Sequence, residues 1–192
     1  MTNHERRSGD AASDASTGPP TDDALAVRFD RVNARSDVAV AAMTSYFEEL
    51  DRRFPDGFDE WASLDEGAAV FDPPDGAFLV VRLAAGPDGV GGGPDGAGVV
   101  VGCGGVLTLG PCIGEIKRMW IDPGWRGRGL ARRLLAELEG IIAGLGHDVV
   151  RLDTNAVLVE AIAMYERAGY VAIDRYNDNP YAERWFEKRL GR

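Results

Sequence analysis

The sequence contains few residues of the kinds that build disulfide frameworks or metal centres. Cysteine and histidine each occur only twice among the 192 residues. Two cysteines are too few for a disulfide framework, and no His, Cys or Asp residues stand at metal-ligand spacing. We therefore expect a protein of the reducing cytoplasm that holds no metal, in which Cys103 packs within a strand.

Positive charge and long apolar runs are also lacking. Lys and Arg number 21 against 31 Asp and Glu, which gives a formal net charge of −10. This balance argues against nucleic acid as the main partner, because duplex binding depends on clustered Lys and Arg. No run approaches the roughly eighteen apolar residues of a membrane span, and the polar start MTNHERRSGD lacks the apolar segment of a signal peptide. We expect neither a nucleic acid nor a membrane as a partner.

The composition instead predicts one globular domain preceded by a polar tail. Apolar residues make up 45% of the chain, and a chain of this length can bury a single core. Residues 1–23 are rich in Ser, Asp, Gly, Thr and Pro, so we expect a disordered tail there and a folded domain over residues 24–192. Residues 86–98, GPDGVGGGPDGAG, predict a flexible hairpin loop.

Hydrophobic periodicity predicts an alternation of strands and helices. The predicted strands span residues 24–29, 77–84, 99–109, 114–122, 148–154, 170–176 and 183–190. The predicted helices span residues 37–53, 60–66 and 159–168, and a further helix opens after Gly127 and closes at Gly144 or Gly146. Antiparallel strands followed by a strand–helix–strand crossover predict a mixed sheet in an α+β domain.

The segment Glu115–Ala131, EIKRMWIDPGWRGRGLA, is the most informative part of the chain. An apolar strand ends in a turn that enters a helix through the residues RGRG, 126–129. Two glycines let the backbone approach a ligand, the helix N-terminus offers unpaired N–H groups, and two arginines add positive charge. The pattern predicts a pyrophosphate cradle, and the alternative is a Gly-rich turn with two solvated arginines. It is not a P-loop, which requires a following Gly-Lys-Ser/Thr, and Arg132 stands where a dinucleotide fingerprint has its third glycine.

Two motifs, in order, resemble the signatures of the GNAT family of N-acetyltransferases. Arg126-x-x-Gly129-x-Ala131 is similar to the family's Arg/Gln-x-x-Gly-x-Gly/Ala motif. Further along, Leu152-Asp153-Thr154 and then residues 160–170, EAIAMYERAGY, resemble the second motif: a strand, a short helix with a Tyr, and a Gly-aromatic exit. The resemblance extends over residues 24–190. It implies the GNAT fold, with a mixed, mostly antiparallel central sheet flanked by helices, and an enzyme that uses acetyl-CoA as cosubstrate.

The resemblance also implies how acetyl-CoA is held. In the family the pantetheine arm bonds to the backbone of the strand before the cradle, where the sheet splays open, and the cradle N–H groups hold the pyrophosphate. The alternatives are core packing for Met119 and Ile121 and a surface ion pair for Arg126. Leu158 stands where many members have an Asn that contacts the cofactor, so that contact is absent or supplied from elsewhere. The expected cofactor-binding residues are Met119, Trp120, Ile121, Arg126, Gly127, Arg128, Gly129, Leu130, Ala131 and Arg132.

Three residues are expected to carry the chemistry. Tyr165 matches the family's general acid, and a phenol with a pKa of about 10 can protonate a leaving thiolate. Glu115 aligns with the general base of one branch of the family and is the first candidate for that role. Asp153 aligns with the base of another branch and is the second candidate, and a site in which neither acts as base is the third possibility. The alternatives are a helix Tyr with a solvated hydroxyl and strand-end carboxylates paired with a nearby Lys or Arg.

The acceptor is expected to be a primary amine of a small molecule or amino acid, because no dedicated docking tract of one charge sign is evident. A second hypothesis is a GNAT-fold sensor that binds acyl-CoA without transferring the acyl group, and a third is a longer acyl donor. Monomer and homodimer are both left open. The candidates for the acceptor pocket, each with a core-packing alternative, are Tyr46, Phe47, Glu49, Phe54, Trp61, Tyr176 and Trp185.

Overall fold

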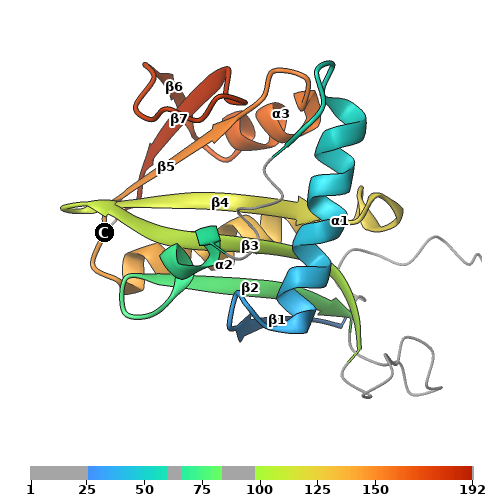
Figure 1. The fold of residues 1–192 in the computed structure, drawn as a ribbon. Helices are drawn as coiled ribbons and strands as arrows, with labels where there is room; N and C mark the ends of the chain where they lie inside the picture. Colours follow the sequence, from blue (N-terminus) through green and yellow to red (C-terminus); the bar gives the residue numbers. More distant parts are fainter. Residues whose placement is uncertain (1–25, 60–65, 84–97, 192) are drawn as a thin grey trace, which may run out of the picture.

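The computed structural model describes residues 26–59, 66–83 and 98–191 (Figure 1). The predicted tail, the greater part of the predicted helix at 60–66 and nearly all of the predicted loop at 86–98 lie outside these ranges. The elements are β1 (Val27–Val32), α1 (Asp37–Arg53), the 3₁₀ helix η3 (Glu66–Phe71), β2 (Gly76–Leu83), β3 (Val99–Gly110), β4 (Ile113–Ile121), the 3₁₀ helix η4 (Pro123–Trp125), α2 (Leu130–Gly144), β5 (Val149–Thr154), α3 (Val159–Arg167), β6 (Val171–Ile173) and β7 (Arg184–Arg189).

The described strands form one mixed sheet in the order β1-β2-β3-β4-β5-β7-β6. Strands β1 to β4 pair antiparallel in succession, whereas β4 and β5 pair parallel and are joined by α2. The last two pairings, β5 with β7 and β6 with β7, are antiparallel again. The predicted α+β class and mostly antiparallel sheet are confirmed.

The parallel pairing of β4 with β5 is short, and the two strands then separate. Among the described residues, Glu115 and Arg151 form the last pair, although β4 continues to Ile121 and β5 to Thr154. The β3–β4 register also shifts here, because Cys103 pairs with Trp120 and Gly105 with Lys117. A β-bulge of this kind bends a strand and increases its twist. The sheet therefore opens along the end of β4 that leads to the expected cradle.

The helices cover both faces of the sheet (Figure 1). Helix α1 crosses one face and contacts β2, β3 and β4, while α2 contacts β3 and β4 from the other. The apolar face of α2 is buried, with Leu134, Leu138 and Ile142 fully inaccessible, because its large side chains recur at helical spacing. Small residues on α1, including Ala39 and Ala42, let that helix approach the sheet closely.

Two predicted strands were wrong at their boundaries, and one element was not predicted. The first strand spans Val27–Val32 instead of 24–29, because its pairing with β2 runs from Val27–Leu83 to Val32–Phe78. The strand predicted at 170–176 is only Val171–Ile173, since β6 pairs with β7 over three residues before the chain turns inward at Tyr176. The 3₁₀ helix η3 was not predicted.

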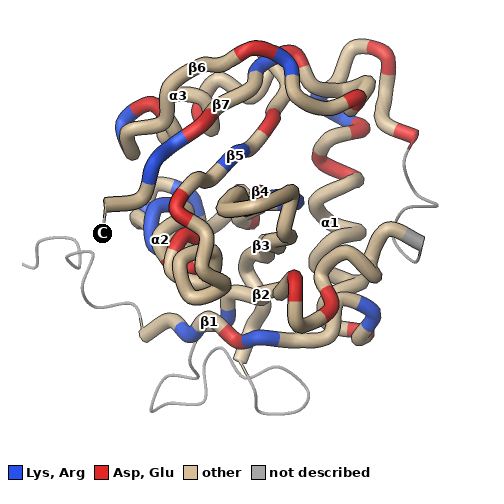
Figure 2. The backbone as a smooth tube through the Cα atoms, turned by 90° about the vertical axis from the view of Figure 1, so that its left-hand side faces the viewer, with Lys and Arg blue, Asp and Glu red and all other residues tan. Residues whose placement is uncertain are grey.

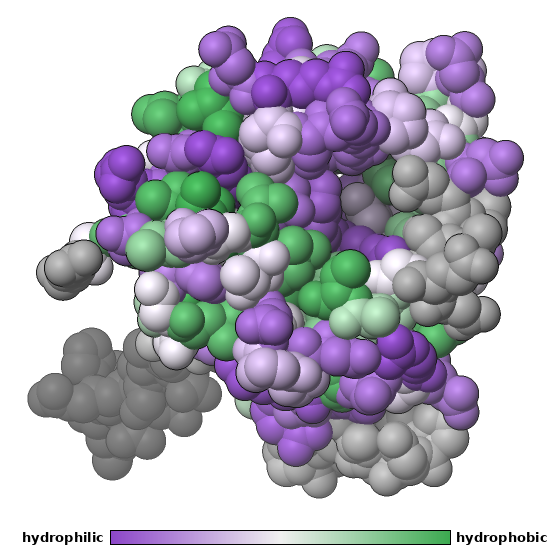
Figure 3. Space-filling model, turned by 60° about the vertical axis from the view of Figure 1, so that its left-hand side comes forward, coloured by the Kyte–Doolittle hydropathy of each residue, from purple (hydrophilic) through white to green (hydrophobic). Residues whose placement is uncertain are grey.

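The outer surface mixes charges of both signs with scattered apolar side chains. Acidic and basic residues are scattered along the backbone in Figure 2, and polar side chains interrupt the apolar ones on the face in Figure 3. None of the described helices is long and apolar enough to cross a membrane. The large apolar side chains left exposed in the described part are Val70, Val99, Leu109, Val159 and Val171.

Candidate active site

Two cavities lie where β4 and β5 separate, between α1 and α3. The first, called the cradle cavity, has a volume of about 330 Å³ and reaches the N-terminus of α2. The second, called the aromatic cavity, has a volume of about 480 Å³ and is walled by Phe and Tyr rings from α1, residues 54–58 and residues 178–181. Both cavities are lined by Tyr46, Leu50, Met119, Leu158, Ala161 and Tyr165. The cavities therefore adjoin at a point flanked by two phenol groups.

The N-terminus of α2 presents its backbone N–H groups to the cradle cavity. Gly127 and Gly129 have φ angles of 75° and 73°, a backbone conformation that residues other than Gly rarely adopt. Among the described residues, none of the N–H groups of residues 127–132 donates to a backbone carbonyl. A Cβ atom at Gly127 would meet nothing within 4 Å. Unpaired donors at the positive end of a helix dipole form a site for phosphate oxygens.

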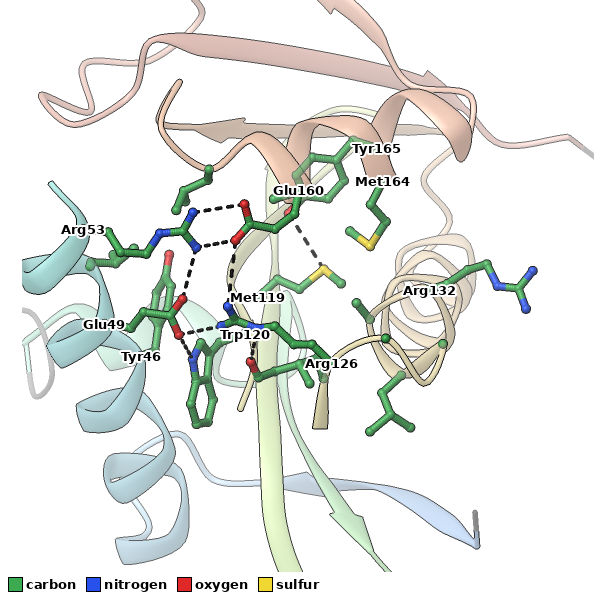
Figure 4. Close-up of a pocket in the computed structure, with 18 of the residues that line it drawn as sticks. Tyr46, Glu49, Arg53, Met119, Trp120, Arg126, Arg132, Glu160, Met164 and Tyr165 are labelled. Atoms are coloured by element: carbon green, nitrogen blue, oxygen red, sulfur yellow. Dashed lines mark hydrogen bonds and ion pairs between the residues drawn. The ribbon is translucent and has the colours of Figure 1, made fainter. Parts of the chain in front are cut away.

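The cavity brings together the residues expected to bind the cofactor, with one exception. All of them line the cradle cavity except Arg128, whose guanidinium lies 4.7 Å from the centre of the half-buried Trp125 ring. In Figure 4, Arg132 points away from the acidic side chains of the cavity. The Arg128 side chain thus has a cation–π contact at the surface, and Arg132 extends outward from the first turn of α2.

The side chain of Arg126 turns inward and away from the helix N-terminus (Figure 4). Its Nε donates to the carbonyl oxygen of Ile121 at 2.9 Å, and its Nη2 donates to Oε2 of Glu49 at 2.5 Å. The ion pair considered as the alternative for Arg126 is therefore present, although it is partly buried. Burial opposes the charge of Glu49, but hydrogen bonds from Arg126 and Trp120 outweigh it and lower the pKa of Glu49.

A second arginine links α1 to α3 across the open part of the sheet. Arg53 of α1 holds Glu160 of α3 with both terminal nitrogens, the Nη2–Oε2 distance being 3.0 Å. The same guanidinium donates to Oε1 of Glu49 at 3.2 Å and to the carbonyl oxygen of Val157 at 3.1 Å. The hydrogen bond from Arg53 lowers the pKa of Glu160. These side chains and Arg126 form one charge network, named here the Glu49–Arg126 network, along the wall of the cradle cavity (Figure 4).

Tyr165 and Tyr46 face the junction of the two cavities from α3 and α1. Oη of Tyr165 lies 3.9 Å from Sδ of Met119 on β4. Burial raises the pKa of both phenols above their ordinary value. Each is therefore a protonated hydrogen-bond donor at neutral pH.

Glu115 is buried and lines neither of the two cavities. It contacts the segment that connects β6 to β7. Its residue surface is 3% exposed. Its Oε1 accepts hydrogen bonds from Oη of Tyr176 at 2.6 Å and from Nδ2 of Asn177 at 3.2 Å, and it lies 3.1 Å from Nζ of Lys117. These contacts match the alternative to a base role, in which Glu115 is a strand carboxylate paired with a nearby Lys.

Asp153 belongs to the same group of side chains but also lines the aromatic cavity. It forms an ion pair with Lys117 and accepts from Nδ2 of Asn177 at 2.9 Å and from Nδ2 of Asn179 at 2.5 Å. Burial opposes the charge of Lys117, but Asp153 and Glu115 outweigh this effect and raise its pKa. The structure thus brings both candidate bases together, and of the two only Asp153 lines one of the two cavities, although its side chain is only 3% exposed.

Aromatic side chains from distant segments form the wall of the aromatic cavity. The ring centroid of Phe58 lies 4.9 Å from that of Phe47 and 4.8 Å from that of Tyr181. Tyr181 is held in turn by its hydroxyl, which accepts from the backbone N–H of Asp59 at 2.9 Å. Sequence reasoning missed Phe58, Tyr181 and Asn179, because they lie outside regular elements and no motif marks them.

The acceptor-pocket candidates separate into two groups. Tyr46, Phe47 and Phe54 line the aromatic cavity, whereas Glu49 lines the cradle cavity. The remaining described candidates are occupied elsewhere: Tyr176 donates to Glu115, and Nε1 of Trp185 donates to Oδ1 of Asn177 at 2.9 Å. Trp61 lies outside the described residues.

The remaining titratable side chains near the site provide no nucleophile or metal centre within the described ranges. Cys103 is fully buried in β3, where burial raises its pKa to about 12. Its predicted packing within a strand is confirmed. Among the described residues, no group of three or more His, Cys, Asp or Glu side chains could hold a metal ion.

Comparison with known proteins matches this arrangement to one family. Residues 41–170 match the model of the Acetyltransferase (GNAT) family. An IAA acetyltransferase of Azospirillum brasilense is 30% identical over 149 residues, which covers 77% of this chain and 88% of that protein. A GNAT-family acetyltransferase structure from Staphylococcus aureus has a TM-score of 0.69 at 15% identity, covering 86% of this chain and 100% of its own. The PaiA N-acetyltransferase of Thermoplasma acidophilum, solved with coenzyme A, has a TM-score of 0.61 at 14% identity and the same coverage.

Proposed function

The chain belongs to the GNAT family of acetyltransferases, and on this premise we propose that it transfers an acetyl group from acetyl-CoA directly to a primary amine of a small molecule or amino acid. The single observation that most supports this is the meeting of two cavities at Tyr165. One cavity ends at unpaired helix N–H groups suited to a pyrophosphate, and the other is a separate chamber that fits an acceptor. Direct transfer needs both substrates to reach one point from two sides.

The residues of the cradle cavity fit acetyl-CoA as a substrate. The N–H groups of residues 127–132 and the two positive-φ glycines would hold the pyrophosphate. The stretch of β4 from Met119 to Ile121 lies beyond the last pair with β5, so its edge is open to an extended pantetheine arm. The Arg126 side chain would shape the cavity through Glu49 instead of binding phosphate, and its backbone would form the start of the cradle.

The reaction requires one proton to leave nitrogen and one to reach sulfur. The amine nitrogen attacks the carbonyl carbon, the carbon–sulfur bond breaks with its electron pair on sulfur, and Tyr165 donates a proton to that sulfur. Its position at the junction of the two cavities suits Tyr165 to this role. Burial raises the pKa of the phenol, which keeps it protonated until the thiolate forms but makes it a weaker acid, so the transfer depends on the thiolate lying beside it. A proton from solvent then restores Tyr165.

We assign the base role to Asp153 in preference to Glu115. Asp153 lines the aromatic cavity together with Tyr165, whereas Glu115 lines neither cavity, although both side chains are buried, that of Asp153 being 3% exposed and that of Glu115 5%. A carboxylate at the cavity surface can attract a protonated amine and take its proton directly or through water. Glu115 then has the role of holding Lys117 and the segment around Asn177 in place.

A screen of primary amines with acetyl-CoA, read by released thiol, tests this function. We expect at least one small amine to be acetylated by the wild type and turned over far more slowly by Tyr165→Phe. Acceptors of moderate size are expected, because the aromatic cavity holds about 480 Å³. Tight binding of acetyl-CoA with no transfer to any amine would instead support the sensor hypothesis.

A further inference from the structure

Tyr46 occupies the same junction as Tyr165, and the acid and base roles above leave its hydroxyl without a function. It projects from α1, opposite the α3 wall that carries Tyr165, and both side chains line both cavities. Figure 4 shows the two rings on opposite sides of the β4 residues of the cavity. A group in this position faces the point at which a molecule that spans the two cavities would pass from one to the other.

The hydroxyl of Tyr46 differs from those of the tyrosines that serve the fold. Tyr170 donates to Glu139 at 3.0 Å, Tyr176 donates to Glu115 at 2.6 Å, and Tyr181 accepts from the Asp59 N–H. Among the described residues, no hydrogen bond is found for Oη of Tyr46, and no side-chain oxygen there is both buried and unpaired. The Tyr46 hydroxyl is therefore open to the cavity, as that of Tyr165 is apart from its long contact with a Met sulfur.

The surroundings of Tyr46 keep its proton in place. Its pKa is raised by burial first and then by the nearby Tyr165, Cys103 and Asp153, while Arg118 opposes the shift. A phenol in this state cannot act as a base, but it can donate a hydrogen bond to an oxygen that gains negative charge. The ring is fixed beside Phe47, with 5.6 Å between the centroids, so the donor is positioned before a substrate arrives.

We propose that Tyr46 donates a hydrogen bond to the carbonyl oxygen of the acetyl thioester during transfer. This inference rests on the proposed function. When the amine nitrogen bonds to the carbonyl carbon, the π electrons of the carbonyl move to its oxygen, where Tyr46 stabilises the charge without giving up its proton. The carbonyl reforms as the carbon–sulfur bond breaks, and Tyr165 protonates the sulfur from the opposite wall. Tyr46 is thus a catalytic residue that acts on oxygen, and Tyr165 one that acts on sulfur.

The infrared spectrum of bound acetyl-CoA tests this proposal without knowledge of the acceptor. With acetyl-CoA carrying ¹³C at the carbonyl, a direct hydrogen bond lowers the carbonyl stretching frequency relative to the free thioester. We expect this lowering in the wild type, its loss in Tyr46→Phe, and its retention in Tyr165→Phe and in the fold control Tyr181→Phe. The dissociation constant and the melting temperature of Tyr46→Phe should stay close to those of the wild type, because the ring and its packing remain.

Turnover provides a second measurement. Removal of one donor to a developing oxyanion lowers kcat by roughly 10²- to 10³-fold, and KM should change little. If the carbonyl frequency in Tyr46→Phe equals that in the wild type, this inference is overturned and the proposed function stands. The same holds if Tyr165→Phe loses the shift and Tyr46→Phe keeps it. Failure of the wild type to bind acetyl-CoA would overturn the proposed function, and this inference with it.

Discussion

Arg126 contributes to the molecule in two ways through two parts of one residue. Its backbone begins the turn into α2, while its guanidinium bonds to Ile121 and Glu49. The sequence motif predicts an Arg at this position, but it does not predict whether the backbone or the guanidinium of that Arg contacts the ligand. The same holds for the carboxylates, since Glu115 and Asp153 share Lys117 but only Asp153 lies at a cavity.

The acid role belongs to a single hydroxyl and is tested by its removal. We predict that Tyr165→Phe lowers kcat by roughly 10²-fold and leaves the dissociation constant of acetyl-CoA nearly unchanged. The ring contacts with Tyr170 and Phe186 remain in this variant, so the fold should persist. Steady-state kinetics and calorimetry measure the two quantities. Full turnover in the variant would contradict the assignment.

The base role predicts a dependence on pH. Asp153→Asn should depress kcat/KM most at low pH, and the loss should shrink as pH approaches the pKa of the amine, since free amine then needs no base. Glu115→Gln is the matched control, because it changes the same Lys117 contacts away from the cavity. We expect it to lower stability without changing the shape of the pH profile. The pH signature in Glu115→Gln alone would exchange the two roles.

At the scale of elements, α1 and α3 are connected by charge where the sheet no longer connects them. The Glu49–Arg126 network spans the region in which β4 and β5 have separated. Helix α1 contributes both Glu49 and Arg53, four residues apart on one face. The ion pairs and hydrogen bonds of this network therefore hold α1 and α3 together in a region where β4 and β5 no longer pair.

Removal of Glu49 tests this cohesion. Glu49→Gln should lower the free energy of unfolding by about 1.5–3 kcal/mol at pH 7, because a buried charge-assisted hydrogen bond is lost. The pKa of Glu49 is lowered in the folded state, so its contribution is fully present above its unfolded pKa of about 4.3 and is lost as pH falls from there through the lower folded pKa. Urea unfolding at several pH values measures this.

A control for that variant lies one residue away. Glu48 is exposed on α1, and Glu48→Gln should change the free energy of unfolding by no more than about 0.5 kcal/mol. Equal destabilisation by both variants, or a Glu49→Gln loss that persists unchanged at low pH, would show that the network does not stabilise the fold in this way.

The N-terminus of α2 is the second element with a testable role. Gly129→Val should raise the dissociation constant of acetyl-CoA at least tenfold, about 1.4 kcal/mol, because Val strains the φ of 73° and displaces the N–H groups. Gly140→Ala is a suitable control, since it lies in the same helix with nothing within 4 Å of its added Cβ. Calorimetry that finds unchanged affinity in a folded Gly129→Val protein would contradict the cradle.

At the scale of the whole molecule, the sheet consists of two parts joined by a short parallel seam. Strands β1 to β4 form one part and β5 to β7 the other, and in the described part of the chain three residue pairs join them. A ligand in the gap between β4 and β5 contacts both parts. Binding should therefore stabilise the entire fold and not only one helix.

Thermal unfolding with coenzyme A measures this coupling. At a ligand concentration of about 100 times the dissociation constant, the folded state gains about 2.7 kcal/mol. For a chain of this size, each kcal/mol raises the melting temperature by roughly 2–4 °C. Gly129→Val should show a smaller rise at the same concentration. The absence of any rise in the wild type would be inconsistent with binding in the gap.

Local patterns along the chain were sufficient for most of the elements and for the family. The helical spacing of apolar residues predicted α1, α2 and α3 to within a few residues, because the core selects side chains at one period. The Gly-rich turn into α2 was recognised because positive φ values restrict the choice of residue. Both features depend only on residues that lie close together in the sequence.

The tertiary structure alone decided which side chains share a surface. Tyr46 and Tyr165 reach one junction because α1 and α3 approach each other where β4 leaves β5. Glu115 is buried because the segment after β6 folds over it with Tyr176 and Asn177. Contacts between residues so far apart in the chain depend on the bending of the sheet and the packing of helices upon it, and no local pattern of residues encodes those distances.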